Sequence, residues 1–186
     1  MTSMSLPSLG TLRSLPVLEH PELLGEPVRA ALAGWSRAGQ VAVVEIKAEL
    51  ADTAAMTAAY SVPLTASANC VVVAGRRDGA ERVAACVVRA DTRADVNSLV
   101  KGIIDVRKAS FLPMERAVEE SGMEYGGITP VGLPARWRLL VDARVAKIEV
   151  AIIGSGVRHS KLLLPGWLFA ELPGAELVVE LGLPVR

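Results

Sequence analysis

The sequence predicts an α+β domain built around a mixed, curved β-sheet with helices packed against it. Segments with strand character outnumber helical ones, and the links between them differ in kind, with one hairpin turn and several helical crossovers. A regular alternation of strand and helix would indicate a doubly wound parallel sheet, whereas mixed links favour the α+β class. The 186 residues are rich in aliphatic and poor in aromatic side chains, and they fit one domain with an appended segment.

Residues 1–39 differ in pattern from residues 40–186, which hold the predicted sheet domain. The stretch up to about Leu18 is rich in Ser, Leu and Pro, so we expect an arm or a poorly ordered lead-in. A helix follows, with Pro27 in its first turn and Gly39 at its end. One face of this helix is apolar at helical spacing, through Val28, Ala31, Leu32 and Trp35.

The rest of the chain alternates strands with short helices. Asp52 or Thr53 caps a helix that runs to Tyr60, and residues 76–79 form a hairpin turn. Further helices are expected at residues 95–103, 113–122 and 165–172, with Met114 facing inward in the second of them. The expected strands are residues 41–46, 69–74, 82–89, 108–111, 138–142, 150–153, 161–164 and 176–181.

Composition and charge exclude several classes of protein. Lys plus Arg equals Asp plus Glu, at 20 each, so the whole chain lacks the basic signature of a nucleic-acid-binding protein. Residues 69–161 are mildly basic, with 15 Lys and Arg against 11 Asp and Glu, which permits a phosphate-bearing partner. We find no export signal and no apolar run that spans a bilayer, and therefore expect a cytoplasmic protein with reduced thiols.

Two glycine-rich loops are the candidate sites for chemistry. The first runs from Tyr125 to Pro134, and its bare amide groups suit a carbonyl or an anion. The second, residues 154–156, is followed closely by Arg158 and Lys161, and loop amides with nearby cations suit an acyl oxygen or a phosphate. Two plainer interpretations remain open: a tight connection between core elements for the first loop, and solvated cations for the second.

Other chemistries lack their sequence patterns. Residues 154–156 follow a strand, but no third glycine opens a helix, so a dinucleotide site is not expected. Ser155 is not in a nucleophile elbow, because that motif needs glycine where Ile153 and Val157 stand. His159 has no evident carboxylate partner as a general base, and Cys70 in a run of valines is better explained as a core residue than as a nucleophile. The two cysteines and two histidines match no paired zinc-ligand spacing, so no metal or other cofactor is expected.

Three segments occur in a characteristic order: the strand at residues 69–73, the Gly-Gly-x-x-Pro-x-Gly loop at residues 126–132, and the Gly-Ser-Gly-Val-Arg segment at residues 154–158. Together they resemble the YbaK-like aminoacyl-tRNA editing family, which includes the editing domain of bacterial prolyl-tRNA synthetases and its free-standing relatives. The resemblance spans roughly residues 41–181. It implies a barrel-like mixed sheet flanked by helices, and hydrolysis of the ester that joins a wrong amino acid to the tRNA 3′ end.

The resemblance also implies roles for individual residues. The glycine loop would hold and polarise the aminoacyl group, while water or a group on the substrate attacks, so no protein nucleophile is needed. Asn69, Gly126 and Gly127 are the expected catalytic positions, and the expected substrate-binding positions are Thr129, Pro130, Gly132, Gly154, Ser155, Gly156, Arg158 and Lys161. Arg158 would approach the terminal adenosine or its phosphate.

One residue departs from the family pattern. Many members place a lysine at the start of the strand where this chain has Asn69, and asparagine donates a hydrogen bond but carries no charge. Asn69 can still position the ribose or the water, Lys47 or Lys161 can take the place of the missing cation in space, or the chain has kept the fold without the activity.

Three functions therefore remain open at the level of sequence. The first is a free-standing deacylase that edits, in trans, a mischarged tRNA carrying a small amino acid, with the aminoacylated tRNA 3′ end as its partner and neither DNA nor membrane. The second is a non-catalytic module that binds a tRNA end or a small acyl ligand on the same fold. The third is an interaction protein that docks a partner through Val28, Leu32 and Trp35. The oligomeric state stays open, a homodimer included.

Overall fold

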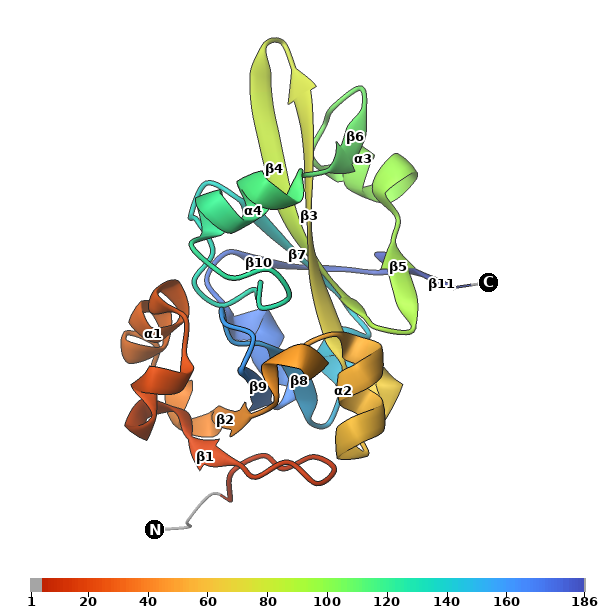
Figure 1. Cartoon of the computed structure of the whole chain (residues 1–186). Helices are drawn as coiled ribbons and strands as arrows, with labels where there is room; N and C mark the ends of the chain where they lie inside the picture. Colours follow the sequence, from red (N-terminus) through yellow and green to blue (C-terminus); the bar gives the residue numbers. More distant parts are fainter. Residues whose placement is uncertain (1–4, 186) are drawn as a thin grey trace.

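The structure, a computed structural model that describes residues 5–185, has an α+β fold with strands in three sheets (Figure 1). The α-helices are α1 (Glu26–Ala33), α2 (Thr53–Tyr60), α3 (Lys101–Ile103) and α4 (Met114–Ser121). The strands are β1 (Leu15–Pro16), β2 (Ala42–Glu45), β3 (Ala68–Arg77), β4 (Ala80–Arg89), β5 (Thr92–Ala94), β6 (Ala109–Phe111), β7 (Arg138–Asp142), β8 (Ala151–Gly154), β9 (Ser160–Leu164), β10 (Ala175–Val178) and β11 (Gly182–Pro184).

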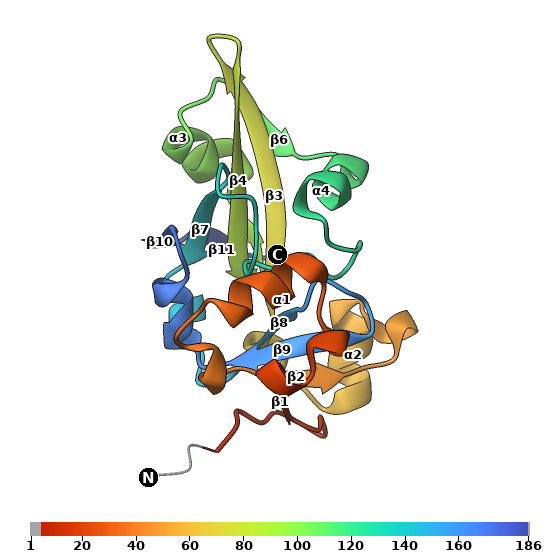
Figure 2. The ribbon, with the colours of Figure 1, turned by 90° about the vertical axis from the view of Figure 1, so that its left-hand side faces the viewer.

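The largest sheet is mixed, as the sequence predicts. Its order is β10-β7-β4-β3-β6, with parallel pairing from β10 through β7 to β4 and antiparallel pairing from β4 through β3 to β6. β3 and β4 are joined by a tight turn in which Asp78 and Gly79 have positive φ values of 51° and 81°. This predicted hairpin extends beyond the rest of the molecule in both views (Figures 1 and 2).

A second sheet, of order β1-β2-β9-β8, is antiparallel throughout and lies at the other end of β3. A single parallel bridge from Ser67 to Ile152 links the start of β3 to β8. β5 and β11 form the third sheet. Across residues 5–185 the sheets do not close into a barrel, so the expected barrel-like sheet is present as separate curved parts of an α+β fold.

The N-terminal segment is packed more closely than the sequence suggests. Leu12 is buried and β1 pairs with β2, so the expectation of a poorly ordered lead-in is wrong for residues 5–18, while residues 1–4 lie outside the described part. α1 ends at Ala33 rather than at Gly39. Val28 and Leu32 are 0% and 1% exposed, and this burial removes the proposed docking face from the surface. The division of the chain at residue 39 stays a prediction.

Three further expectations need correction. Met114 does not face the core, since it is 48% exposed at the first position of α4. The expected helix at residues 165–172 is a 3₁₀ segment, Gly166–Glu171. The expected single strand at residues 176–181 is interrupted, because β10 ends at Val178 and β11 starts at Gly182.

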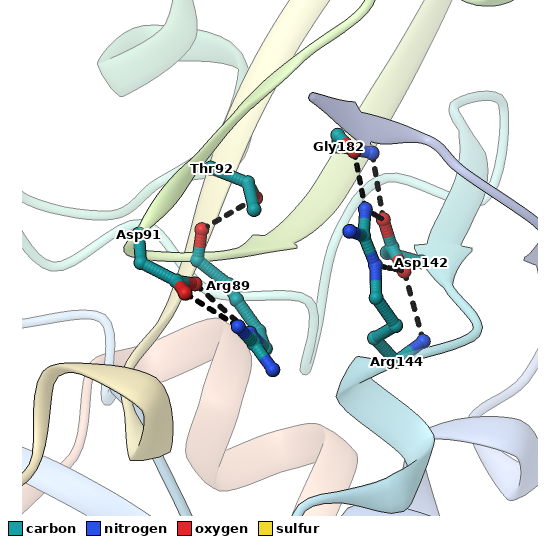
Figure 3. A network of polar contacts seen from close by, with 6 residues as sticks. All are labelled: Arg89, Asp91, Thr92, Asp142, Arg144 and Gly182. Carbon is teal, nitrogen blue, oxygen red and sulfur yellow. Dashed lines mark hydrogen bonds and ion pairs between the residues drawn. The ribbon is translucent and has the colours of Figure 1, made fainter. Parts of the chain in front are cut away.

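A buried carboxylate fixes the last strand to the sheet (Figure 3). Asp142 at the end of β7 is 1% exposed; its Oδ2 accepts a hydrogen bond from the Gly182 N–H at 2.6 Å, and its two oxygens accept bonds from the Arg144 side chain. The Arg144 guanidinium also donates to the Gly182 carbonyl. Nearby, Arg89 and Asp91 form a second, more exposed pair. None of the helices within residues 5–185 has the length and apolar character that a transmembrane span requires.

Candidate functional site

A cavity of about 330 Å³ lies between α2, the start of β3, the glycine loop, and the facing ends of β8 and β9. Its polar lining side chains include Asp52 and Thr53 at the start of α2, Asn69 on β3 and Lys161 on β9. The complete lining is Ala51, Asp52, Thr53, Met56, Ser67, Ala68, Asn69, Cys70, Val71, Met114, Tyr125, Gly126, Ile128, Ile152, Ile153, Gly154 and Lys161.

Asn69 is oriented by the first residue of α2. The Asp52 side chain caps that helix by accepting from the Ala54 N–H, as the sequence predicts. The Thr53 hydroxyl then lies at the cavity wall and donates to Asn69 Oδ1 at 3.0 Å. Because the amide oxygen is engaged, the NH₂ end of Asn69 is left to donate to a ligand in the cavity.

Lys161 is a buried cation that faces the same cavity. It is 7% exposed, and its Nζ donates to the Gly126 carbonyl at 3.3 Å. No carboxylate within residues 5–185 lies within ion-pair distance of it. Burial and the Arg158 guanidinium lower the pKa of the Lys161 amino group from 10.5 to about 8, against the opposite effect of Asp52. A partly desolvated amino group with little compensating charge is typical of a functional site.

The two glycine segments pack backbone against backbone behind the cavity. Gly156 N–H donates to the Gly127 carbonyl at 2.8 Å, and Gly127 N–H donates to the Glu124 carbonyl. A Cβ on Gly127 would lie 2.7 Å from the Val157 carbonyl oxygen, and one on Gly154 would lie 2.6 Å from the Gly127 carbonyl oxygen. Only glycine permits this approach, and Gly126 and Gly154 both line the cavity.

Four of the expected site residues therefore meet at the cavity: Asn69, Gly126, Gly154 and Lys161. Gly127 is buried and lies next to the wall rather than on it. The Gly127 N–H donates to the Glu124 carbonyl and is therefore not available to a ligand in the cavity.

The other expected residues lie elsewhere. Thr129 is buried, and Pro130 and Gly132 line a second cavity of about 360 Å³ beside Trp35 and Trp137. The Ser155 and Ser160 hydroxyls bond each other at 2.7 Å in the core. A Cβ on Gly156 would lie 3.0 Å from the Gly25 Cα, so that glycine serves the contact with the start of α1.

Arg158 contacts the protein rather than the cavity. Its guanidinium donates to the carbonyls of Tyr125 and Ala48, at 2.9 and 3.2 Å. Its Cζ lies 5.8 Å from the centre of the Tyr125 ring, which is 59% exposed at the cavity wall. Sequence reasoning missed Thr53 and Tyr125 as site residues. The position of Tyr125 directly before the glycine pair was a usable signal, whereas Thr53 was visible only as a helix cap.

The other candidate groups offer no nucleophile or base. His159 is exposed and does not line the cavity. Cys70 does line it, but burial, with a smaller contribution from Cys86, raises the pKa of its thiol and disfavours the reactive thiolate. Within residues 5–185 no three His, Cys, Asp or Glu side chains are grouped so that they could hold a metal ion.

Comparison with known proteins finds one matching family model and several solved structures with a similar fold. A model of the aminoacyl-tRNA editing domain matches residues 47–172. The crystal structure of hypothetical protein APE2540 is similar over 85% of this chain and 100% of its own, with a TM-score of 0.72 and 22% identity. A "putative trans-editing enzyme for prolyl tRNA synthetase" is similar over 83% of this chain and 94% of its own, with a TM-score of 0.71 and 17% identity. At these identities the structures establish a shared fold. No curated protein sequence matches the chain significantly.

Proposed function

Because the chain belongs to the aminoacyl-tRNA editing domain family, we propose that it is a deacylase that hydrolyses, in trans, the ester of a mischarged tRNA carrying a small amino acid. The observation that carries the proposal is the convergence of Asn69, Gly126, Gly154 and Lys161 on one cavity. These groups supply hydrogen-bond donors, close backbone approach and a cation, which are the requirements for stabilising an acyl-transfer transition state.

In the proposed reaction, water adds to the ester carbonyl carbon and the bond to the ribose oxygen breaks. The ribose oxygen leaves with a proton, so the products are the free amino acid and a tRNA with a free terminal hydroxyl. Negative charge develops on the carbonyl oxygen, and the protein accelerates the step by stabilising that charge. No covalent enzyme intermediate is required, which agrees with the raised thiol pKa of Cys70 and the position of His159 outside the cavity.

Lys161 takes the part of the family lysine that is absent at position 69. The amino group enters the cavity from β9, while Asn69 enters it from β3. A charged amino group beside Gly126 donates to the developing oxyanion, and the Asn69 NH₂ group orients the ribose or the attacking water. The cation is therefore supplied from another strand, and loss of the usual lysine does not imply loss of activity.

The apolar lining of the cavity supports the proposal of a small amino acid. Ala51, Ala68 and Val71 line the cavity together with the glycines, and the larger apolar side chains of Met56, Ile152 and Ile153 also line it. Such a wall accepts a small side chain and excludes a larger one by size, so a correct product with a bulkier side chain escapes hydrolysis. Tyr125 at the mouth offers an exposed ring face for the terminal adenine.

A non-catalytic module that binds an acyl or tRNA end is the second candidate. It is favoured by one observation, namely that an uncharged Asn69 stands at the slot where the family places its lysine. The two candidates predict the same ligand and differ only in turnover, so one set of variants separates them.

The experiment measures deacylation of tRNAs charged with alanine, serine, cysteine and proline. We expect turnover of one ester by the wild type, a fall of about 100-fold in Lys161→Met, and no change in the control Lys147→Met. The double variant Asn69→Lys/Lys161→Met moves the cation back to β3, and its deacylation rate should be about tenfold higher than that of Lys161→Met alone. If the wild type leaves all four esters at their spontaneous rate but binds a non-hydrolysable aminoacyl-adenosine amide, the binding module is the better account.

A further inference from the structure

A basic groove lies next to the cavity, further along β3. It has a volume of about 420 Å³, and the argument rests on five of its lining residues: Arg76, Arg107, Lys108, Phe111 and Arg116. Arg76 belongs to β3, Arg107 and Lys108 directly precede β6, and Phe111 ends β6. Figure 2 shows β6, α4 and α2 along the same side of β3, so this basic groove and the cavity share one face of the molecule.

The charge of the basic groove is not balanced locally. Its one acidic lining residue, Glu81, accepts from Arg116 at 2.8 Å, and Arg116 also pairs with Glu120. Arg76, Arg107 and Lys108 are exposed and have no carboxylate within ion-pair distance in residues 5–185. By contrast, Arg77 and Arg82 on the same hairpin are paired with Asp105. A local cluster of free cations thus exists on a chain whose net charge is zero.

An exposed aromatic ring stands among these cations. Phe111 is 60% exposed, although its neighbour Leu112 is buried. Exposure of a large apolar ring to water is unfavourable, so a ligand that covers the ring gains binding free energy. Cations combined with an exposed aromatic ring are the arrangement by which proteins hold single-stranded nucleic acid, since the cations contact phosphates and the ring stacks on a base.

The basic groove and the cavity are lined by neighbouring residues of the chain. Pro113 lines the basic groove and the next residue, Met114, lines the cavity. On β3, Cys70 lines the cavity and Ala74 lines the basic groove, and side chains four residues apart point to the same side of a strand. Cys70 at the cavity and Arg76 at the basic groove are six residues apart on the same side of this strand, a span of about 20 Å. A polymer whose end occupies the cavity can therefore continue along β3 over the length of a few nucleotides.

We infer that the basic groove binds the unpaired 3′ strand of an RNA whose terminal nucleotide occupies the cavity, with Arg76, Arg107 and Lys108 on the phosphates and Phe111 on a base. This inference rests on the proposed function for the identity of the RNA. It goes further than that function in two ways: it places the RNA strand along β3 and β6, and it requires the bases of that RNA strand to be unpaired. A duplex hides its base faces, so it would use the cations of the groove but not Phe111.

The test measures binding of an uncharged hairpin RNA with an unpaired 3′ tail, beside the same hairpin with a blunt end. Wild-type protein should prefer the tailed RNA. Arg107→Ala/Lys108→Ala should weaken that binding and reduce the slope of log Kd against log salt by about 0.7 for each cation removed. Arg93→Ala/Lys147→Ala is the matched control, because it removes two exposed cations that lie outside the basic groove and have no carboxylate of residues 5–185 within ion-pair distance.

Phe111→Ala should weaken binding of the tailed RNA by about five- to tenfold and leave the blunt RNA unaffected. Equal binding by the groove variants and the control, or equal binding of tailed and blunt RNA by the wild type, would overturn the inference. Deacylation is assayed separately on the same proteins. If the protein turns over the ester but the groove variants bind tailed RNA as well as the control does, only this inference is overturned. If the tail binds through the basic groove but no ester is turned over, only the proposed deacylase is overturned.

Discussion

The hydroxyl of Thr53 donates to Oδ1 of Asn69 at 3.0 Å, which joins the first residue of α2 to the second residue of β3 across the wall of the cavity. The bond fixes the amide of Asn69 so that its NH₂ end is the one left for a ligand. The cap of α2 and the proposed catalytic position are thereby coupled, because Asp52 caps α2 directly before Thr53.

Thr53→Val should lower kcat/KM for deacylation by about tenfold, because valine keeps the shape of threonine but cannot donate to Asn69. The amide of Asn69 is then free to rotate and loses its fixed donor direction. The matched control is Thr57→Val in the same helix, whose hydroxyl bonds only to backbone carbonyls of α2. Equal losses in the two variants would show that helix stability, and not the orientation of Asn69, causes the effect.

Lys161→Met should stabilise the fold while it impairs the reaction. The pKa of Lys161 falls from 10.5 to about 8 on folding, so at pH 7 the folded protein carries a charge that burial and the nearby Arg158 together make unfavourable by about 3 kcal/mol. Since the unfolded chain binds the extra proton, wild-type stability should rise with pH between about 8 and 10.5, and this rise should vanish in the variant. Urea unfolding at pH 7, 8, 9 and 10 measures it, and a wild type without the rise would contradict the burial of a charged Lys161.

The pH dependence of the deacylation rate tests the proposed role of Lys161 in the reaction. If its protonated amino group stabilises the oxyanion, the ratio of wild-type to Lys161→Met rates should be greatest below pH 8 and fall as the pH rises through 8. Taking the ratio cancels the general increase of ester hydrolysis with hydroxide. A ratio that is constant from pH 6 to pH 9 would exclude this role.

Gly154→Ala should reduce both stability and activity. Its Cβ would lie 2.6 Å from the Gly127 carbonyl oxygen and 2.9 Å from that of Ile128, so the two glycine segments must separate and the cavity must change shape. We expect a loss of about 2 kcal/mol in the free energy of unfolding. Gly102→Ala is the control, because nothing lies within 4 Å of its added Cβ, and alanine in a helix is neutral or stabilising. A Gly154→Ala protein as stable as the wild type would show that the segments can move apart freely.

Asp142→Asn should destabilise the protein by about 3 kcal/mol, since it leaves Arg144 without its buried carboxylate. Burial raises the pKa of Asp142, but bonds from Arg144 and Gly182 outweigh it and hold that pKa below 3.8. The stabilisation is therefore present above pH 3.8 and is lost as the pH falls through the lower, folded-state value. Asp91→Asn, in the more exposed pair with Arg89, should cost less than 1 kcal/mol. Thermal unfolding at pH 7 compares the two, and equal losses would contradict the dominance of burial.

Much of the local structure could be predicted because it depends on neighbouring residues. The cap at Asp52, the hairpin turn at Asp78 and Gly79, and the end of α4 at Gly122 are confirmed. Each depends on a side chain or a permitted φ within a few residues of the chain. The prediction that Met114 faces inward was wrong, because its surroundings depend on distant parts of the chain. Helical periodicity does not show that the first residue of α4 is exposed and lines the cavity.

The sequence alone determined the fold class, the order of most strands and helices, and the membership of the editing family, because hydrophobic periodicity, glycine spacing and turn chemistry are properties of the linear chain. Only the tertiary structure decided which polar groups share a cavity. Asn69 and Lys161 are 92 residues apart, and they meet because β8 and β9 pair beside the start of β3. The same packing placed Ser155 and Gly156 away from the cavity, where the Ser155 hydroxyl bonds that of Ser160 and Gly156 lies against Gly25.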